Sequence, residues 1–423
     1  MRSFFLVPTL AGLLAGCEQR PAATTAAPPA PPAPVAATRS APPAPDTLDY
    51  TRPLPGAREV HPDTLIALGS RHYWLQMRQV SDSTRPFDYG PTAIAGRHFA
   101  APSDTAWQQR RVRGYDGTYT FTLRDSTRRQ VIFHRQLHKQ DLRAGSPAEV
   151  LTVSEPAFYY RGYSPGLGAL LFVLETGISY SDVIHRAALL LDARTGLVQA
   201  LHDIGSASFE ATDCAPRVSG DGRSVLTCAD ELLRAGRPPL SLKRPHAEVR
   251  AANFLTDTTL LVVYAFGDYR PTKPEPGDSA TARTDNSSDP TVTAGFYVPN
   301  VEFRSTPAQL RAANAFIYGT SGHVLNQFNY DNWAPGMGDE LPIRALAATR
   351  TYYLVSHARD LVLLPRAQPG TVQKIPIKSL PRFRPPRRPQ EVAFTLYSER
   401  GTYTFYVDKA NPRAIRYQLA RGE

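Results

Sequence analysis

The residues best suited to chemistry lie in the stretch NYDNWAPGMGDE, at residues 329–340. Its aromatic side chains, Tyr330 and Trp333, are of the kind that stack on the face of a sugar ring. Carboxylate and amide oxygens accept hydrogen bonds from hydroxyl groups, and they are also the ligands that calcium prefers. The stretch therefore predicts a ligand-binding loop, whose polar members are Asp331, Asn332, Asp339 and Glu340. An ordinary turn anchored by a Trp is the alternative, because Asp, Asn and Gly are common turn residues.

A second stretch with chemical potential is the basic segment KIPIKSLPRFRPPRRP, at residues 374–389. A guanidinium group can bind a phosphate through two parallel hydrogen bonds. The segment therefore predicts an anion-binding site for phosphates of lipopolysaccharide, membrane lipid or nucleic acid, and its arginines are Arg382, Arg384, Arg387 and Arg388. The alternative is a solvated loop, and the high Pro and Arg content near residues 381–389 predicts a lack of regular structure.

The usual signatures of nucleophilic and zinc-dependent enzymes, GxSxG, HExxH and CxxC, do not occur in the sequence. His134 and His138 have the spacing of a zinc-binding helix, but the segment around them alternates like a strand. Four residues of strand span about 13 Å, which is too far for two ligands of one ion. We therefore expect both histidines at the surface, and we expect no metal, no cofactor and no catalytic residue.

The first 17 residues indicate where the protein is placed. A single early positive charge, Arg2, precedes an apolar run at residues 4–16 that is too short to span a bilayer. The run ends in LAGC, at residues 14–17, which resembles the lipobox of bacterial lipoproteins. The resemblance implies that a signal peptide, residues 1–16, is removed and that the thiol of Cys17 is acylated, which would anchor the chain to a membrane of the cell envelope. A plain signal peptide with an unrelated Cys is the alternative.

Residues 17–47 continue as a Pro- and Ala-rich tether. Pro-rich chains are extended and stiff, so roughly 25 residues at about 3.1 Å each would hold a folded body tens of ångströms from the lipid. The net charge of +10 would suggest nucleic acid for a cytosolic protein. Export argues against nucleic acid, and we expect the membrane, an envelope protein or a glycan as partners instead.

The two remaining cysteines, Cys214 and Cys228, lie in the stretch CAPRVSGDGRSVLTC. Each is seven residues from Asp221, which occupies the centre of a Gly-Asp-Gly turn signal. A hairpin centred there would bring the two Cβ atoms to within about 5 Å, which permits a disulfide after slight closure. A register shift of one residue would break this pairing, so two unpaired thiols are the alternative.

Alternating apolar and polar residues predict strands along most of the chain from residue 48 onward. Clear examples are residues 72–80, 117–123 and 129–137, and the end of the chain predicts a hairpin over residues 391–408. One short helix is predicted in STPAQLRAAN, where Thr306 can cap the first turn and Gln309 can complete a capping box. The insertion at residues 267–295 has almost no apolar residues and predicts an unstructured loop.

The middle of the chain carries turn motifs in a repeating order. The stretch ALLLDARTGLVQALHD, at residues 188–203, followed by PRVSGDGRSVLT, at residues 216–227, resembles one blade-to-blade step of periplasmic TolB-like β-propellers. A further copy of the first half, AFIYGTSGHVLNQFNYD, begins at residue 315. Gly196 and Gly322 are 126 residues apart, which corresponds to three repeats of 42, about one propeller blade each.

The resemblance implies an all-β, propeller-like region over residues 146–423, preceded by a β region over residues 48–145. A pair of β-sandwich domains is the alternative architecture. These patterns favour a lipid-anchored protein that acts as a non-catalytic binding or scaffolding module of the cell envelope. The alternative function is an envelope hydrolase for polysaccharide or peptide, which would need two carboxylates about 5 to 9.5 Å apart across a groove, from Asp331, Asp339 and Glu340.

Overall fold

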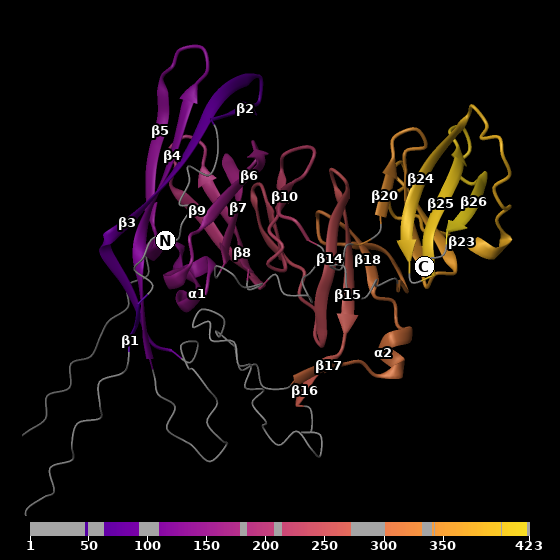
Figure 1. Ribbon diagram of the computed structural model, residues 1–423. Coiled ribbons are helices and arrows are strands. Elements are labelled where there is room, and N and C mark those ends of the chain that lie inside the picture. Colours follow the sequence, from indigo (N-terminus) through magenta and orange to yellow (C-terminus); the bar gives the residue numbers. More distant parts are fainter. Residues whose placement is uncertain are drawn as a thin grey trace, which may run out of the picture. The chain divides into compact units, whose positions relative to one another are not determined.

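The protein is an all-β chain, shown in Figure 1 as a computed structural model. The described part belongs to one compact unit, Pro45–Glu423. The residues described are 47–49, 63–92, 110–177, 184–206, 214–271, 301–331, 341, 343–398 and 400–420. The signal peptide, Cys17 and the tether, which the sequence predicts before residue 47, lie outside them. Among the described residues, no helix is both long enough and apolar enough to cross a bilayer.

The first sheet is built around one long strand, β4, which pairs along its length with β3. Its lower end also pairs with β1 in parallel, and its upper end pairs with β5. The strands of this sheet are β1 (Thr47–Asp49), β2 (Thr64–Leu68), β3 (Arg71–Thr92), β4 (Arg110–Asp125) and β5 (Val131–His138). They confirm the strands predicted from alternation between residues 72 and 137. Two short helical segments follow, η2 (Lys139–Gly145) and α1 (Ala148–Val153).

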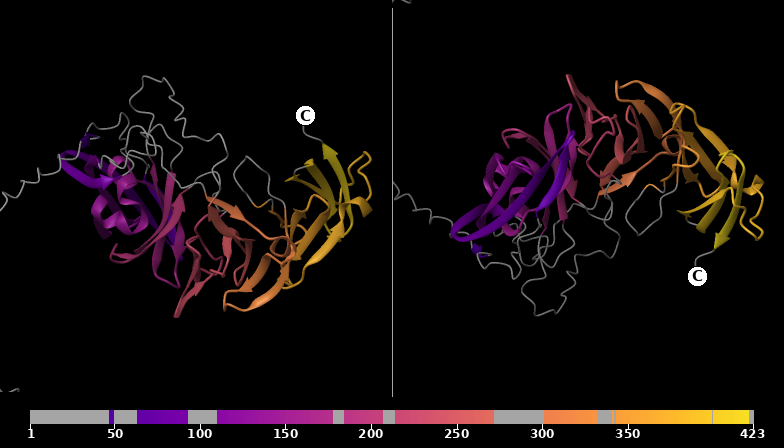
Figure 2. Two further views of the ribbon diagram at one scale, coloured as in Figure 1. Left: turned by 90° about the horizontal axis from the view of Figure 1, so that it is seen from below. Right: turned by 90° about the horizontal axis from the view of Figure 1, so that it is seen from above.

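The rest of the described chain folds into antiparallel meanders, each of which occupies one interval of the colour scale (Figures 1 and 2). The second sheet contains β6 (Ala157–Ser164), β7 (Ala169–Gly177), β8 (Ile184–Asp192) and β9 (Val198–Ser206). The third contains β10 (Arg217–Val218), β11 (Ser224–Leu226), β12 (Glu231–Arg234) and β13 (Arg237–Ser241).

The last three meanders follow the same order of strands along the chain. The fourth sheet contains β14 (Ala247–Thr256), β15 (Thr259–Phe266), β18 (Ala315–Gly319) and β19 (Val324–Phe328). The fifth contains β20 (Ile343–Leu346), β21 (Thr351–Ser356), β22 (Asp360–Pro365) and β23 (Gln373–Pro376). The sixth contains β24 (Glu391–Ser398), β25 (Gly401–Asp408) and β26 (Ile415–Ala420), which includes the hairpin predicted over residues 391–408.

Each sheet shares a hydrophobic core with the next sheet along the chain. Strand β7 shows how: Leu170 and Phe172 belong to the core shared with the first sheet, whereas Leu171 belongs to the core shared with the third. A strand that is covered on both faces reads as a continuous apolar run. Meanders stacked face to face in chain order make the fold propeller-like, as the turn motifs predicted.

The repeat interval inferred from the sequence is wrong. Gly196 lies in the turn between β8 and β9, and Gly322 lies in the corresponding turn between β18 and β19. The copy between them is Gly236, in the turn between β12 and β13. All three have positive φ values, of 71°, 102° and 66°, a conformation that favours glycine. The two outer glycines are therefore two sheets apart and not three, because an insertion lengthens the fourth sheet.

This insertion starts with regular structure. Strand β16 (Asp268–Pro271) pairs with β17 (Val301–Arg304), so residues 268–271 are not the loop that the sequence predicts. Residues 272–300 lie outside the described residues. The short helix α2 (Pro307–Arg311) follows β17, and it confirms both the Thr306 cap and the Gln309 capping box.

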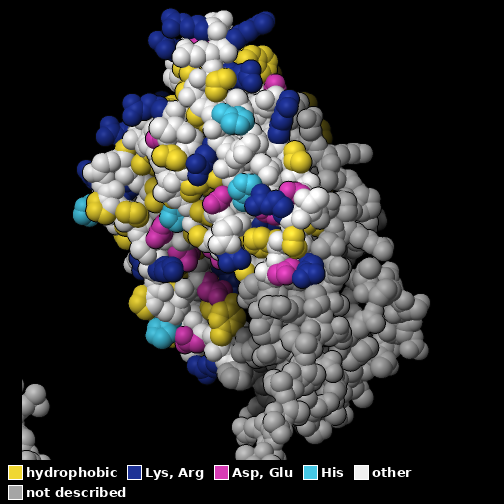
Figure 3. Space-filling model, turned by 90° about the vertical axis from the view of Figure 1, so that its left-hand side faces the viewer, with side chains coloured by type: hydrophobic (Ala, Val, Ile, Leu, Met, Phe, Trp, Pro, Cys, Tyr) yellow, Lys and Arg dark blue, Asp and Glu magenta, His cyan; other side chains and the backbone are white. Residues whose placement is uncertain are grey.

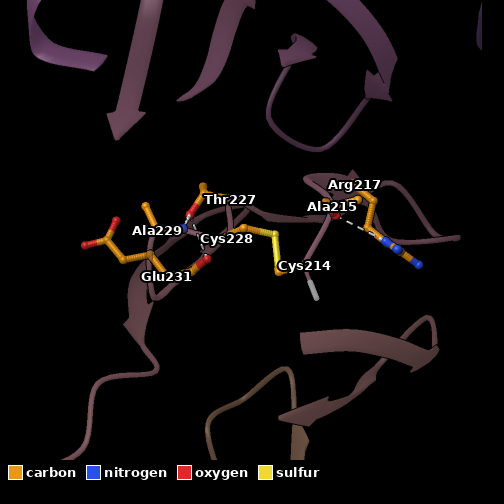
Figure 4. Close-up of a disulfide and its surroundings, with 7 residues drawn as sticks. All are labelled: Cys214, Ala215, Arg217, Thr227, Cys228, Ala229 and Glu231. Carbon is orange, nitrogen blue, oxygen red and sulfur yellow. Dashed lines mark hydrogen bonds between the residues drawn. A yellow bond between two sulfur atoms is a disulfide. The ribbon is translucent and has the colours of Figure 1, made fainter. Parts of the chain in front are cut away.

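The disulfide between Cys214 and Cys228 is present, with 5.6 Å between the two Cα atoms (Figure 4). The prediction is confirmed, but the register behind it is not. In the hairpin of β10 and β11, Arg217 pairs with Leu226, one residue away from the register that a turn centred on Asp221 would give. The bond still forms because both cysteines lie beyond the paired residues, where Cys228 adopts a left-handed backbone conformation with φ 64°.

The sequence analysis divides the body at residue 145, between an N-terminal β region and the propeller-like region. In the structure, this point does not separate two hydrophobic cores. It falls between η2 and α1, and the core of the first sheet also contains residues of the second sheet. Phe121 of β4, for example, makes an edge-to-face contact with Phe172 of β7 at 5.2 Å between ring centroids.

Candidate anion-binding site

The Pro- and Arg-rich tract near residues 381–389 is held beside β26. The backbone N–H of Phe383 donates to the carbonyl oxygen of Tyr417 at 2.8 Å, and the N–H of Tyr417 donates to that of Pro381 at 3.1 Å. Arg382 and Tyr417 form a parallel bridge. As predicted, residues 381–389 form no helix or strand, but their hydrogen bonds to the edge of β26 hold the backbone of the tract in place.

An aromatic side chain fixes the middle of the tract. The ring of Phe383 stacks on Tyr406 at 3.8 Å between centroids and 11° between planes. The guanidinium of Arg416 lies 5.0 Å from the centroid of the same Phe383 ring. Phe383 is thus in contact with both β25 and β26, which keeps the arginines on either side of it at the surface.

A buried carboxylate holds the end of the tract. The guanidinium of Arg416 donates to both oxygens of Glu391, at 2.8 and 2.6 Å, and the N–H of Arg388 donates to the same carboxylate at 3.0 Å. These contacts, first among them the hydrogen bond from Arg416, hold the pKa of Glu391 below its usual value. Arg387 donates to the backbone oxygen of Glu391, and Arg416 donates to that of Arg384. Glu391 and Arg416 therefore act as a clasp for the tract.

The four predicted arginines divide into two kinds. The side chain of Arg387 is occupied by the backbone of Glu391. The side chains of Arg382, Arg384 and Arg388 are exposed, and no carboxylate of the described residues lies within salt-bridge distance of them. Arg382 lies over the Tyr417 ring at 4.5 Å. Three permanent positive charges thus lie along a fixed backbone.

Sequence reasoning missed Arg416 and Tyr406, which position this tract. Both lie on strands that pair with each other, β26 and β25. Their relation to the tract depends on strand register, for which the local sequence carries no signal.

The predicted loop at residues 329–340 is described only in part. Tyr330 is 1% exposed and belongs to the core of the fourth and fifth sheets, so its ring is not a surface for stacking on a ligand. Asp331 is exposed, and its carboxylate lies 3.5 Å from Nδ1 of His357. Asn332, Trp333, Asp339 and Glu340 lie outside the described residues. The ligand-binding role of this loop, and the spacing of its carboxylates, stay predictions.

The two histidines suggested by helical spacing lie on β5, as the strand pattern predicts. His134 is exposed, and its Nδ1 lies 3.0 Å from Oγ1 of Thr122. Nδ1 of His138 lies 3.5 Å from a carboxylate oxygen of Asp116. In the described part of the chain, no group of three or more His, Cys, Asp or Glu side chains is placed to hold a metal ion.

The sequence analysis did not predict a buried lysine, which lies at the start of η2, directly after β5. Lys139 is fully buried, and its Nζ donates to the carbonyl oxygen of Thr152 in α1 at 3.2 Å. Burial lowers the pKa of Lys139 to about 8, and the negative charges of Glu155 and Asp116 offset part of that effect. The ammonium group also lies 5.1 Å from the ring centroid of Tyr115. These contacts tie α1 to the sheet.

Comparison with known proteins adds likeness in fold only. No known protein family and no curated protein matches this sequence. Among solved structures, the chain is similar to a Dos1 propeller (7% identity, TM-score 0.29, covering 73% of this chain and 67% of that one). It is also similar to an oligogalacturonate lyase in complex with manganese (12% identity, TM-score 0.25, covering 71% and 72%). A third is TolB from Acinetobacter baumannii (12% identity, TM-score 0.20, covering 73% and 78%). Scores this low carry no argument about function.

Proposed function

We propose that this protein is a non-catalytic binding module of the bacterial cell envelope, anchored through an acylated Cys17, and that it binds anionic polymers on the arginine tract. The observation that carries this proposal is the exposure of Arg382, Arg384 and Arg388 on a backbone that β26 and Phe383 hold in place. A site whose backbone is already ordered loses less conformational entropy on binding than a mobile loop does.

The chemistry of the tract favours binding over catalysis. Its buried carboxylate, Glu391, already accepts hydrogen bonds from Arg416 and from the N–H of Arg388. With a lowered pKa it stays ionised at neutral pH, so it is not suited to act as a general acid there. The arginines keep their charge at every physiological pH and match phosphate or carboxylate oxygens in pairs.

The sequence supports placement in the envelope. The run LAGC at residues 14–17 has the form of a lipobox, and the disulfide of Cys214 and Cys228 suits an oxidising compartment. In this setting the net charge of +10 favours anionic polymers such as phosphorylated glycans.

The test is binding of fluorescently labelled inorganic polyphosphate to the full chain. We expect a variant with Arg382→Gln, Arg384→Gln and Arg388→Gln to bind at least about tenfold more weakly, since each exposed arginine contributes charge-assisted hydrogen bonds. Binding by the parent should weaken as ionic strength rises from about 0.05 to about 0.5 M.

The matched control removes the same charge elsewhere, with Arg194→Gln in the β8–β9 turn, Arg237→Gln on β13 and Arg344→Gln on β20, all at exposed positions. This variant should keep the parent affinity within about threefold, because at about 0.15 M salt charges more than about 8 Å from the site are largely screened. Equal losses in both variants would contradict a site at the arginine tract.

A further inference from the structure

The first sheet carries an apolar row on the face opposite its core. Leu65 pairs with Trp74, Trp74 pairs with Arg124, and Arg124 pairs with Val131, so the four side chains cross β2, β3, β4 and β5 on one face. On β2, β3 and β4 a residue adjacent to the row is part of the buried core: Ile66, Leu75 and Leu123. The row lies near the turns that join β2 to β3 and β4 to β5.

The apolar members of this row are open to solvent. Leu65 is 50% exposed, Trp74 is 42% exposed and Val131 is 44% exposed. The pairing of β4 with β5 shifts register beside Arg124, and Ile132 is 36% exposed as well. Single exposed apolar side chains are normal, but a contiguous group of this kind marks a surface that contacts something.

Positive charge lies at the β4–β5 side of the row. Arg124 lies within it, and the exposed Arg128 and Arg129 lie in the β4–β5 turn. The nearby carboxylate of Asp125 is occupied inside the turn, where Oδ1 accepts hydrogen bonds from the backbone N–H groups of Thr127 and Arg128. We call this surface the hairpin tip, and it consists of Leu65, Trp74, Arg124, Arg128, Arg129, Val131 and Ile132.

Figure 3 shows this side of the molecule. Lys and Arg side chains gather at the upper end, where the β4–β5 turn lies in Figure 1, and hydrophobic side chains lie among them. The hairpin tip thus combines exposed apolar side chains with positive charge. The arginine tract does not offer its aromatic ring in this way, because Phe383 is stacked between Tyr406 and Arg416.

We propose that the hairpin tip docks on the surface of a bilayer that contains anionic phospholipid. Trp is favoured at the level of the lipid head groups, and aliphatic side chains gain by entering the boundary with the acyl chains. Arginines beside them are attracted to lipid phosphates while their apolar stems stay with the hydrocarbon.

The length of the tether permits this contact. The chain enters the first sheet at β1, where Thr47 pairs with Arg111, about 40 Å along β4 from Arg124. The roughly 30 residues from Cys17 to β1 can span about 90 Å when extended. A lipid on Cys17 and the hairpin tip can therefore occupy the same bilayer. This reach matters only when Cys17 is acylated as proposed, whereas binding of vesicles by the hairpin tip does not require the acyl chain.

The experiment uses the full chain with Cys17→Ala, which removes the site of acylation, and sedimentation with lipid vesicles. We expect binding to vesicles of phosphatidylcholine with phosphatidylglycerol, and little binding to phosphatidylcholine alone. Each arginine near an anionic surface changes the partition by about fivefold. Adding Arg124→Gln, Arg128→Gln and Arg129→Gln should therefore weaken binding on the order of 100-fold.

The charge-matched control adds Arg194→Gln, Arg237→Gln and Arg344→Gln instead, at exposed positions outside both proposed sites, and it should bind these vesicles within about threefold of the parent. Circular dichroism of each variant verifies folding. Equal binding to both kinds of vesicle, or an unchanged partition in the hairpin-tip variant, would overturn the proposal. A separate variant with Arg382→Gln, Arg384→Gln and Arg388→Gln tests the alternative, and a loss confined to that variant would move lipid binding to the arginine tract.

A second measurement reports contact by the tip itself. In the Cys17→Ala chain with Trp107→Phe and Trp333→Phe, Trp74 is the one remaining tryptophan. Its fluorescence should shift to shorter wavelength with anionic vesicles and should be quenched by lipids with brominated acyl chains. Trp74→Ser in the original tryptophan background should lower the partition about tenfold, while Leu325→Ser, at an exposed apolar position of β19, should not. An unquenched Trp74 in the presence of bound vesicles would contradict docking by this surface.

Discussion

Arg416 on β26 reaches across the central strand β25 and binds both carboxylate oxygens of Glu391 on β24. Both side chains are largely buried, with 14% and 4% of their surface exposed. The pair joins the two outer strands of the sixth sheet and also holds the arginine tract through Arg384 and Arg388. Stability of this sheet and anion binding are therefore linked.

Arg416→Met should destabilise the protein, because it leaves the Glu391 carboxylate buried without its cation. Loss of one partner of a buried pair costs about 3 kcal/mol of unfolding free energy. Urea unfolding followed by circular dichroism measures the change. Arg413→Met, at an exposed position before β26, is the control and should change the free energy by less than about 1 kcal/mol. Similar changes in unfolding free energy for both variants would rule out a stabilising pair of Arg416 and Glu391.

Removal of the Phe383 ring should weaken anion binding without removing an arginine. Phe383→Ala deletes the stacking on Tyr406 and frees the tract, so the ordered backbone that favours binding is lost. We expect about tenfold weaker binding of labelled polyphosphate. Phe383→Tyr keeps the ring and should bind like the parent. Unchanged binding by Phe383→Ala would mean that the arginines act as a loose charge cluster.

Stability should rise with pH around Lys139. Its folded pKa of about 8 lies below the usual lysine pKa of 10.5, so the unfolded chain binds more protons between these pH values. The unfolding free energy therefore increases from pH 8 to pH 10.5, by at most roughly 3 kcal/mol. The unfolding free energy of the parent and of Lys139→Met should be measured in urea at steps of about one pH unit between pH 7 and pH 10. The difference between the two pH profiles isolates the contribution of Lys139. A parallel pH profile in the two proteins would exclude it.

The disulfide should contribute measurably to stability. The two cysteines are 14 residues apart, and closing a loop of this size restricts the unfolded chain by about 3 kcal/mol. Cys214→Ala with Cys228→Ala should lower the unfolding free energy by about this amount, and a reducing agent should affect the parent but not the variant. A parent that is insensitive to reduction, and as stable as the variant, would contradict the bond.

Acylation of Cys17 is directly testable in cells. Growth of a bacterium that expresses the chain with a radioactive fatty acid should label the protein, and Cys17→Ala should abolish the label. Mass analysis of the mature chain should show that residues 1–16 are absent. An unlabelled parent chain that keeps these residues would contradict the envelope placement.

Local patterns in the sequence determined the features that depend on neighbours along the chain. Alternation at residues 117–123 was enough to predict a strand, since side chains of a strand point to opposite faces in turn. The Thr306 and Gln309 cap was likewise visible, because a capping box closes within four residues. The symmetry of Cys214 and Cys228 about one turn predicted the disulfide even though the register differs by one residue.

Only the tertiary structure decided which distant residues meet. Gly236 could be identified as the missing repeat only after the strands were paired. The burial of Lys139 depends on α1 packing against the first sheet, and the clasp of Arg416 and Glu391 depends on the register of β24, β25 and β26. The sequence by itself determined the strands and turns, because these follow from short-range sterics and hydrogen bonds. The partners of each charge were decided by the pairing and packing of strands that lie far apart along the chain.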